Sequence, residues 1–512
     1  MIRPQHHPFP THLVAGFALA KLVVHLVSIQ GYGYFRDELY YLACADHPSF
    51  GYVDHPPFSI WILWVVRLLI GDSTIAIRLV PALLGAATVA LIGAMAHRMG
   101  AGRWGVTLAM SGGLAAPVFL ALDHFYSMNA WDLFFWAAVG HLVLGLGGDE
   151  QPRPSRWALL GGVLGLGLLN KISILWLGAG LAMGILIARP RWLQTSGPWI
   201  AGGISMAMFS PYLIWQVTND WPTREFIANA TAQKMVSVSP LAFLSGQVEM
   251  MLVFVLPLWL AGLLWLLAAP AARHHRILGV AYLTVFAILM MAGSSRANYL
   301  APAYTWLLAG GGVFWGSWLD RPRLTLLRPM AMVLILMGGA VAAPLALPIL
   351  PVEQHVAWAR ALGQAPATEE RKELGRLGQF FADMHGWPEI VDTVAGVYES
   401  LPDIERGEVR IFAPNYGIAG AVDVLGQRRG LPPAISGHNQ YWLWGPRGWQ
   451  GGTLIIVGGD RQDLEAIFDR VDEAAIIDCG LCMPYENGQA VWVARGLKPD
   501  LDAAWATTKH FE

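Results

Sequence analysis

The sequence has few charged residues for its length. Lys, Arg, Asp and Glu make up 14% of its 512 residues, and hydrophobic residues make up 55%. Soluble domains carry about 25% charged residues, so this shortage excludes an ordinary soluble protein. The mean hydropathy of +0.45 indicates a polytopic membrane protein. The formal net charge of −2 gives no basic surface, and nucleic acid is therefore not an expected partner.

Cysteine and the common catalytic motifs are also scarce. Of the three cysteines, Cys44 stands alone, and Cys479 and Cys482 form a Cys-Gly-Leu-Cys that allows a disulfide. A thioredoxin-like role is not favoured, because Pro484 and Gly488 follow the pair in place of a helix. The sequence has no zinc-binding pattern, no P-loop and no Gly-x-Ser-x-Gly motif. The chemistry must come from other residue types.

Long apolar segments fill the first 350 residues or so. A membrane-spanning helix needs about 20 apolar residues. The first segment is too long for a signal-peptide core and has no clear cleavage site, so a retained helix is predicted. About eleven spans are expected, at 12–30, 74–97, 104–122, 130–148, 157–170, 173–188, 198–216, 247–269, 276–293, 299–318 and 327–350.

The stretch 58–70 is short and carries Arg67, which favours an interfacial or re-entrant helix over a twelfth span. With eleven spans and a cytoplasmic N-terminus, Arg and Lys follow the positive-inside rule. The cytoplasmic segments then hold twelve such residues: Arg3, Arg98, Arg103, Arg153, Arg156, Arg189, Arg191, Arg273, Arg276, Arg321, Arg323 and Arg328. The opposite loops hold six: Arg36, Arg67, Lys171, Arg224, Lys234 and Arg296. The loop around Asp37 and the C-terminus are therefore predicted to lie outside.

The composition changes from about residue 352, where charges become frequent and long apolar runs stop. Strands alternating with helices indicate a small α/β domain. The strands are predicted at 409–413, 453–457, 473–478 and 490–494, and the helices at 416–429 and 461–470. The chain is thus predicted to have a transmembrane domain, 1–351, and a soluble extracytoplasmic α/β domain, 352–512. The aromatic residues of 436–446 are expected either to stack on sugar rings or to form a structural loop.

Acids and isolated cations gather at one predicted membrane face. An acid can take a proton from a hydroxyl nucleophile, and isolated cations in a partly dry cavity can hold a phosphate leaving group. Charge of this kind cannot face lipid without a large energetic penalty. The set comprises Arg36, Asp37, Glu38, Asp54, His55, Asp123, His124, Asn129, Asp132, Lys171 and Arg296.

Each of these residues also has a structural interpretation. Asp37 and Glu38 can be solvated loop charges, and Asp54-His55-Pro56-Pro57 can be a turn that enters a helix. His55 alone can be a structural histidine. Asp132 can lie at the interface, Lys171 can extend its ammonium group to the interface, and Arg296 can anchor its segment there.

The ordered set of motifs resembles the C-type integral-membrane glycosyltransferases over about residues 12–320. Within that family it is most similar to the bacterial branch related to protein O-mannosyltransferases, the lipid A aminoarabinose transferase and the lipid A galacturonosyl transferases. The motifs are Phe35-Arg36-Asp37-Glu38-Leu39-Tyr40-Tyr41, Tyr52-Val53-Asp54-His55-Pro56-Pro57-Phe58, Asn129-Ala130-Trp131-Asp132, Leu169-Asn170-Lys171 and Arg296-Ala297-Asn298-Tyr299.

The resemblance implies an inverting transfer of a sugar from a polyprenyl phosphate to lipid A, a cell-envelope glycan or a protein. Asp37 matches the catalytic acid of the family. Arg36, His55, Lys171 and Arg296 are expected to bind the donor phosphate or sugar, although the aminoarabinose transferase has a lysine where this chain has His55. Glu38, Asp54, Asn129 and Asp132 are expected to orient the site.

The resemblance also implies membrane helices with interfacial helices in the first outer loop. The expected location is a bacterial cytoplasmic membrane, with the active site on the periplasmic side and membrane lipids as partners. No cofactor is certain, and a divalent metal on Asp37, Asp54 and His55 is compatible with the sequence. The sugar and the acceptor are left open.

Two rival functions are compatible with the apolar body. A transporter or lipid flippase would place functional residues near the membrane midplane, often at broken helices in paired repeats. Here the acids gather at one predicted face and the sequence has no internal repeat. A non-catalytic scaffold that presents the outer domain to a partner would bind a prenyl-phosphate sugar without transferring it.

Overall fold

The computed structural model describes residues 8–512 and divides into two compact units. Unit 1 comprises Met1–Gly31, Ile75–Ile214 and Ser237–Pro351. Unit 2 comprises Tyr32–Thr74, Trp215–Val236 and Val352–Glu512. Three segments far apart in the sequence therefore fold together as unit 2. Arg3, which contributes to the charge distribution above, lies outside the described residues.

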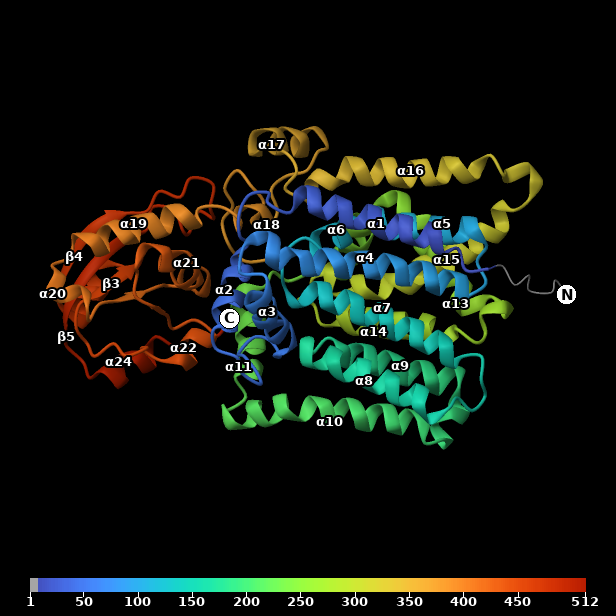
Figure 1. The fold of residues 1–512 in the computed structure, drawn as a ribbon, viewed down its shortest axis with the longest axis horizontal. Helices are drawn as coiled ribbons and strands as arrows, with labels where there is room; N and C mark the ends of the chain where they lie inside the picture. The colour runs from blue at the N-terminus through green and yellow to red at the C-terminus, as the bar shows by residue number, and fades with distance from the viewer. Residues whose placement is uncertain (1–7) are drawn as a thin grey trace. The chain divides into compact units, whose positions relative to one another are not determined.

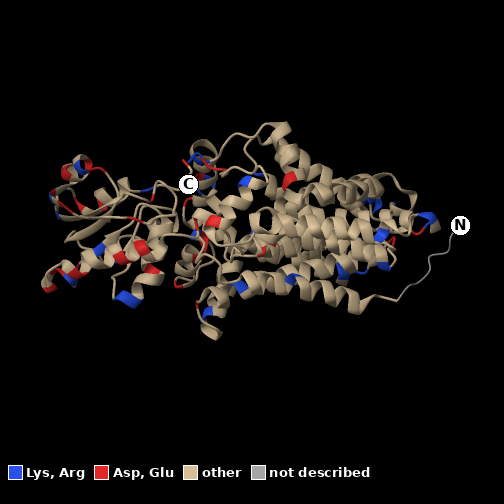
Figure 2. Cartoon of the chain, turned by 90° about the horizontal axis from the view of Figure 1, so that it is seen from above, with Lys and Arg blue, Asp and Glu red and all other residues tan. Residues whose placement is uncertain are grey.

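Unit 1 is a bundle of apolar helices that run side by side (Figure 1). Charged residues are sparse along these helices and dense in the C-terminal part of unit 2 (Figure 2). The helices are α1 (Thr11–Ser28), α4 (Thr74–Arg98), α5 (Arg103–Ala115), α6 (Pro117–Leu122), α7 (Met128–Leu146), α8 (Pro154–Asn170), α9 (Ile174–Ala188), α10 (Gly197–Thr218), α12 (Pro240–Met251), α13 (Leu256–Ala268), α14 (Arg276–Met291), α15 (Tyr304–Leu319) and α16 (Leu327–Ala342).

Helices thus occur at every predicted span. Within the described residues, five helices are long and apolar enough to cross a membrane, or six if one bent pair counts as a single span. The number of eleven spans stays a prediction.

Two predicted spans are not continuous helices, and these predictions are wrong in that respect. The segment 104–122 breaks at Ala116, because Pro117 cannot continue the backbone hydrogen bonding of α5. The segment 247–269 breaks after Met251, and its two halves meet at an angle of 89°. Leu252 there has φ +70°, a left-handed conformation that ends α12.

Glycines allow close approach in the centre of the bundle. A Cβ atom on Gly262 of α13 would collide with the carbonyl oxygen of Leu307 on α15. On α5, a Cβ on Gly105 would collide with the carbonyl oxygen of Gly312 on α15. Larger side chains at these positions would keep the backbones apart. The close approach increases the dispersion attraction between the helices, as is typical of helices in membranes.

The N-terminal part of unit 2 contains two short helices, α2 (Arg36–Ala45) and α3 (Phe58–Leu69). The 12 residues of α3 span about 18 Å, too little for a hydrocarbon core of about 30 Å. Its C-terminal half exposes Trp64, Leu68 and Leu69. These properties fit the predicted interfacial helix at 58–70. The second segment of unit 2 adds α11 (Pro222–Asn229) and a π-helical turn, η2 (Ala230–Lys234).

The C-terminal segment of unit 2 contains a five-stranded mixed sheet with the strand order β2-β1-β3-β5-β4. β1 is parallel to β2 and β3, and β5 is antiparallel to β3 and β4. The strands are β1 (Arg410–Phe412), β2 (Ala434–Ile435), β3 (Leu454–Val457), β4 (Phe468–Ile476) and β5 (Ala490–Leu497). The helices are α17 (Val352–Ala361), α18 (Gln379–Ala382), α19 (Trp387–Ser400), α20 (Asp403–Arg406), α21 (Tyr416–Leu425), α22 (Gln440–Trp444), α23 (Arg461–Ile467) and α24 (Leu501–Thr507).

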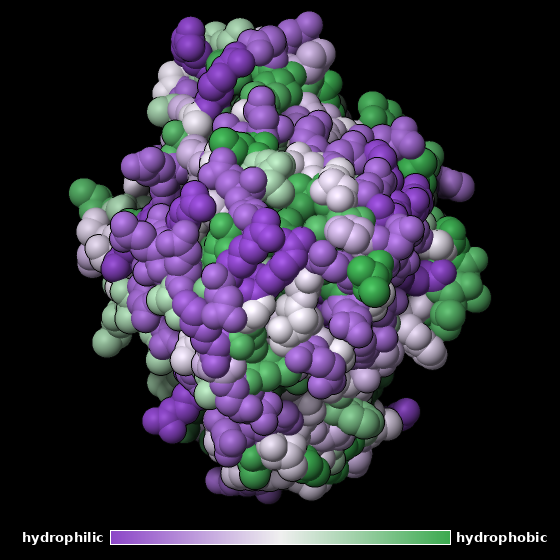
Figure 3. Space-filling model, turned by 90° about the vertical axis from the view of Figure 1, so that its left-hand side faces the viewer, coloured by the Kyte–Doolittle hydropathy of each residue, from purple (hydrophilic) through white to green (hydrophobic). Residues whose placement is uncertain are grey.

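Both faces of this sheet are covered. Leu454, Ile456 and Trp492 form a core with Trp505 of α24 on one face. Because side chains alternate along a strand, Ile455 points to the opposite face, where α19 contacts β3 and β4. The side of the molecule seen in Figure 3 is mainly hydrophilic, with scattered apolar groups.

Some local predictions in this segment need correction. The helix predicted at 461–470 ends at Ile467, and β4 begins at Phe468. Within 436–446 the chain forms α22, where Tyr441 is buried and donates a hydrogen bond to Asp423 at 2.9 Å. Packing inside the unit thus accounts for Tyr441. Cys479 and Cys482 are joined by a disulfide.

Candidate active site

Asp37 lies in the first turn of α2, where negative charge is favoured by the helix dipole. The next residue, Glu38, is fully buried, and its carboxylate accepts a hydrogen bond from the Phe35 backbone N–H at 2.8 Å. Glu38 therefore caps the helix. The Asp37 side chain remains 33% exposed. Of the two adjacent acids, Asp37 is the one that a substrate can reach.

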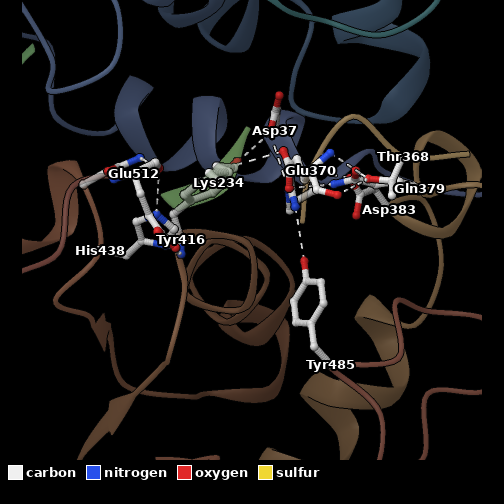
Figure 4. Close-up of polar contacts among 12 residues, drawn as sticks. Asp37, Lys234, Thr368, Glu370, Gln379, Asp383, Tyr416, His438, Tyr485 and Glu512 are labelled. Carbon is white, nitrogen blue, oxygen red and sulfur yellow. Dashed lines mark hydrogen bonds and ion pairs between the residues drawn. The ribbon is translucent and has the colours of Figure 1, made fainter. Parts of the chain in front are cut away.

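Asp37 is held from a distant part of unit 2 (Figure 4). The Tyr416 hydroxyl, at the start of α21, donates a hydrogen bond to Asp37 Oδ1 at 3.1 Å. The Nε atom of Arg36 lies 3.7 Å from the same oxygen. The carboxylate thus has one neutral hydrogen-bond donor and one cation close to it.

The guanidinium group of Arg36 lies close to two carboxylates of the C-terminal segment. One of its nitrogens lies 3.6 Å from Glu370 Oε1 and 3.6 Å from Asp383 Oδ2, and another donates to the Tyr485 hydroxyl at 3.2 Å. Lys234 lies 3.8 Å from the same Glu370 oxygen. Arg36 and Glu370 therefore join α2 and η2 to the C-terminal segment.

Burial changes the acidity of this cluster. It raises the pKa of the Asp383 carboxyl to about 7, against the opposing effect of Arg36. It raises the pKa of Glu486, next to Tyr485, to about 8, and the nearby Asp383 adds to this rise. Both side chains are almost fully buried, and the described residues give neither Glu486 oxygen a hydrogen-bond donor.

Asp54 and His55 form a second group on the loop before α3. Tyr40 of α2 donates to Asp54 Oδ1 at 2.9 Å, and His55 Nε2 lies 3.8 Å from that oxygen. The His55 ring stacks on Tyr41 at 4.7 Å and is 1% exposed. Burial raises the pKa of Asp54. The predicted turn into a helix is confirmed, with Pro57 immediately before α3, while phosphate binding by His55 stays a prediction.

Asn129, Asp132 and Lys171 come together in unit 1. Lys171 Nζ donates to Asn129 Oδ1 at 2.7 Å and lies 3.5 Å from Asp132 Oδ2. Ser173 donates to Asp132 Oδ1 at 2.8 Å. Lys171 also lies 5.4 Å from the ring centre of Tyr299. The two spans predicted at 157–170 and 173–188 correspond to α8 and α9, which thus meet at a turn that presents Lys171 to α7.

Arg296 and the pair Asp123–His124 have different surroundings in unit 1. Arg296 is half-buried and precedes the 3-10 helix η5 (Ala297–Ala303), which carries Tyr299. Asp123 and His124, predicted in an outer loop, are only 1% exposed. Asp123 forms a buried ion pair with Lys21 at 3.0 Å. The predicted loop position is confirmed, since both residues lie between the end of α6 at Leu122 and the start of α7 at Met128, but this loop is buried within unit 1.

The sequence motifs contain Arg36, one neighbour of Asp37, but not Tyr416, which donates a hydrogen bond to Asp37. The motifs also do not contain the residues that link Arg36 to the rest of unit 2, which are Lys234, Glu370, Asp383 and Tyr485. The one local signal is Asn415, a favourable N-cap whose side chain accepts from the Ile418 N–H and so fixes the start of α21. Within residues 8–512, no group of three His, Cys, Asp or Glu side chains is arranged to bind a metal.

Similarity to known proteins agrees with the motifs. The model of the dolichyl-phosphate-mannose-protein mannosyltransferase family matches residues 54–215, a range that contains Asp54, Asp132 and Lys171. The lipid A galacturonosyltransferase RgtD of Rhizobium johnstonii is 26% identical over 214 residues, which are 41% of this chain and 43% of RgtD. The chain thus matches less than half the length of this curated relative.

Two solved structures have a similar fold. ArnT from Cupriavidus metallidurans, bound to undecaprenyl phosphate, aligns with a TM-score of 0.62 at 15% identity, over 94% of this chain and 98% of ArnT. An oligosaccharyltransferase from Archaeoglobus fulgidus, in complex with Zn and sulfate, aligns with a TM-score of 0.52 at 11% identity. The alignment covers 87% of this chain and 68% of the oligosaccharyltransferase. The fold is that of the C-type integral-membrane glycosyltransferases, and the resemblance identified from the motifs is confirmed.

Proposed function

We propose that this chain is an inverting membrane glycosyltransferase that moves a sugar from a polyprenyl phosphate to an acceptor hydroxyl. The observation that carries the proposal is Asp37, an exposed carboxylate fixed at a helix N-terminus by Tyr416. A general base must be accessible and held in place, and Asp37 meets both conditions. The shared fold with ArnT, whose structure contains undecaprenyl phosphate, supports the class of donor.

The proposed reaction is a single displacement at the anomeric carbon. The acceptor oxygen attacks C1 of the sugar while its proton passes to Asp37. The bond between C1 and the phosphate oxygen breaks, and the polyprenyl phosphate leaves with the electron pair. Attack opposite the leaving group inverts the configuration at C1.

Lys171 and Arg296 are proposed to bind the donor phosphate. Lysine has three donors, and the geometry of Lys171 commits them only in part, to Asn129 and to Asp132. Asn129 and Asp132 would then hold the ammonium group in place. Arg36 has a different role in this proposal, because its guanidinium group already contacts Glu370 and Asp383. It positions α2, and through α2 it positions Asp37.

Lipid A is the acceptor that we propose first, since the name of the curated relative RgtD gives lipid A as its acceptor. A cell-envelope glycan and a protein are the alternatives. The chain is proposed to lie in the cytoplasmic membrane of a bacterium, with unit 2 on the periplasmic side. The mainly hydrophilic surface in Figure 3 supports contact of unit 2 with water.

The experiment is transfer from a defined undecaprenyl-phosphate sugar to lipid A by the purified protein. Asp37→Asn should lower turnover by about 10²–10⁴-fold, the usual contribution of a general base. Asp46→Asn is a matched control, because Asp46 lies at the end of the same helix and its carboxylate pairs with Arg67 on the surface. Near-normal turnover in a folded Asp37→Asn protein would refute the role of Asp37. Lipid movement across vesicles without any transfer would favour the flippase.

A further inference from the structure

The C-terminal segment contributes one residue that touches the proposed base directly. We propose that Tyr416 is a positioning residue, which fixes the Asp37 carboxylate by a hydrogen bond and directs its second oxygen to the acceptor. This inference rests on the proposed function of Asp37. Tyr416 takes Oδ1 at 3.1 Å, and the described residues provide no bonding partner for Oδ2.

The backbone of Tyr416 is fixed on both sides. Asn415 caps α21 by accepting a hydrogen bond from the Ile418 N–H at 2.9 Å. The Tyr416 N–H points to Nδ1 of His438 at 3.3 Å. Burial lowers the pKa of His438, so its ring is neutral and Nδ1 can accept this bond. The first turn of α21 is therefore held in one orientation.

The ring of Tyr416 is fixed as well. It packs against Tyr40 at 4.7 Å and against His438 at 4.7 Å, and the Arg36 guanidinium carbon lies 5.5 Å from its centre. Such contacts leave the hydroxyl little freedom to swing away from Asp37. Burial raises the pKa of Tyr416, which keeps the hydroxyl protonated and able to donate.

Two glycines set the distance between α21 and α2. A Cβ on Gly417 would lie 2.8 Å from Cγ of Arg36, and a Cβ on Gly420 would lie 2.9 Å from the carbonyl carbon of Leu39. Both distances are too short for a side chain without movement of one helix. Glycine at these positions therefore lets α21 approach α2 closely enough for the Tyr416 hydroxyl to reach Asp37.

Loss of the Tyr416 hydroxyl removes the hydrogen bond to Asp37 Oδ1 and should let the Asp37 side chain rotate away from the acceptor. The other charged groups around Asp37 are unchanged by this substitution, and they include Arg36, Lys234, Glu370, Asp383 and Asp54.

The test compares Tyr416→Phe with Tyr398→Phe in the purified full chain. Tyr398 is the matched control, because among residues 8–512 its hydroxyl bonds to the Arg406 carbonyl oxygen alone, at 3.4 Å. In Tyr416→Phe, kcat should fall by on the order of tenfold or more at an unchanged KM, since hydrogen bonds to charged groups are among the stronger ones. Tyr398→Phe should leave both unchanged.

A second pair of variants keeps the hydroxyl and changes only the helix spacing. Gly420→Ala inserts a Cβ against α2, whereas Gly396→Ala on α19 places its Cβ in open space. Gly420→Ala should lower kcat in the same way as Tyr416→Phe, and Gly396→Ala should not. Melting temperatures identify any variant that fails to fold.

One readout does not depend on transfer. A water-soluble carbodiimide labels accessible carboxyl groups, and Asp37 is exposed enough to react. Mass spectrometry should show faster labelling of Asp37 in Tyr416→Phe than in Tyr398→Phe, because the Tyr416 hydroxyl no longer holds the carboxylate. Unchanged labelling and turnover in Tyr416→Phe, with Asp37→Asn inactive, would overturn the role of Tyr416 alone. Faster labelling in a protein that transfers no sugar would support the contact and refute the proposed function.

Discussion

Asp37 in unit 2 and Asp132 in unit 1 are both acids of the sequence motifs, but their surroundings differ. Asp37 is 33% exposed and accepts a hydrogen bond from a neutral tyrosine. Asp132 is 3% exposed, accepts a hydrogen bond from Ser173 and pairs with Lys171. A buried carboxylate paired with a cation favours the charged state of its partner, whereas an exposed one can exchange a proton with a substrate. These surroundings fit Asp37 as a general base and Asp132 as a residue that holds the ammonium group of Lys171 in place.

The largest expected effect tests this separation directly. Asp37→Asn should lower kcat by about 10²–10⁴-fold with little change in KM. Asp132→Asn should instead raise KM for the polyprenyl-phosphate donor, because Lys171 loses its counter-ion and its fixed position. Steady-state kinetics with varied donor concentration distinguishes the two results. Equal losses of kcat in both variants would break the comparison.

Lys171 should give a smaller and more selective effect. Lys171→Met keeps the length of the side chain and removes the charge. Loss of one charge-assisted bond to phosphate should weaken donor binding by roughly 10- to 100-fold. Binding of undecaprenyl phosphate, measured by calorimetry in detergent, checks this directly. Lys498→Met is the control, because Lys498 bonds to the Glu465 carbonyl oxygen on the surface of unit 2. Undiminished binding by Lys171→Met would move the phosphate site elsewhere.

The two acids also differ in how far the sequence could predict their surroundings. Lys171 lies on the turn between α8 and α9. Its partners Asn129 and Asp132 lie near the start of α7, the helix that precedes α8. Their meeting follows from neighbouring spans that pack together. Tyr416 lies 379 positions from Asp37 along the chain. No local periodicity reports such a contact, because it depends on the tertiary packing of α21 against α2.

The same limit applies to the fold. Composition indicates apolar helices and locates the change near residue 352. It does not indicate that 32–74 and 215–236 fold together with the C-terminal segment. Mean hydropathy also does not detect the bend after Met251, because that bend depends on the backbone of Leu252, a residue as apolar as its neighbours. Breaks and long-range contacts are properties of packing, which a window of sequence does not contain.

The smallest expected effect concerns stability and belongs to the acids behind Asp37. Folding raises the pKa of Asp383 to about 7 and of Glu486 to about 8, above the usual values of about 4 in unfolded chains. Between about pH 4 and pH 8 the folded protein therefore binds more protons than the unfolded protein. The stability that these groups contribute is greatest below pH 4 and is lost as the pH rises through 7 and 8.

Asp383→Asn and Glu486→Gln remove this titration while keeping the shape of the side chains. Between pH 6 and 9 the melting temperature of the wild-type protein should fall, and the double variant should flatten the fall by on the order of several °C. Arg36, Glu370, Asp37 and Lys234 face Asp383, and Arg36 and Tyr485 face Glu486; all stay in place. Glu389→Gln, on the exposed side of α19, should leave the slope unchanged. An identical slope in the double variant and the wild type would show that Asp383 and Glu486 do not control the pH dependence of the melting temperature. The stability of the cluster behind Asp37 would then not depend on pH in this range.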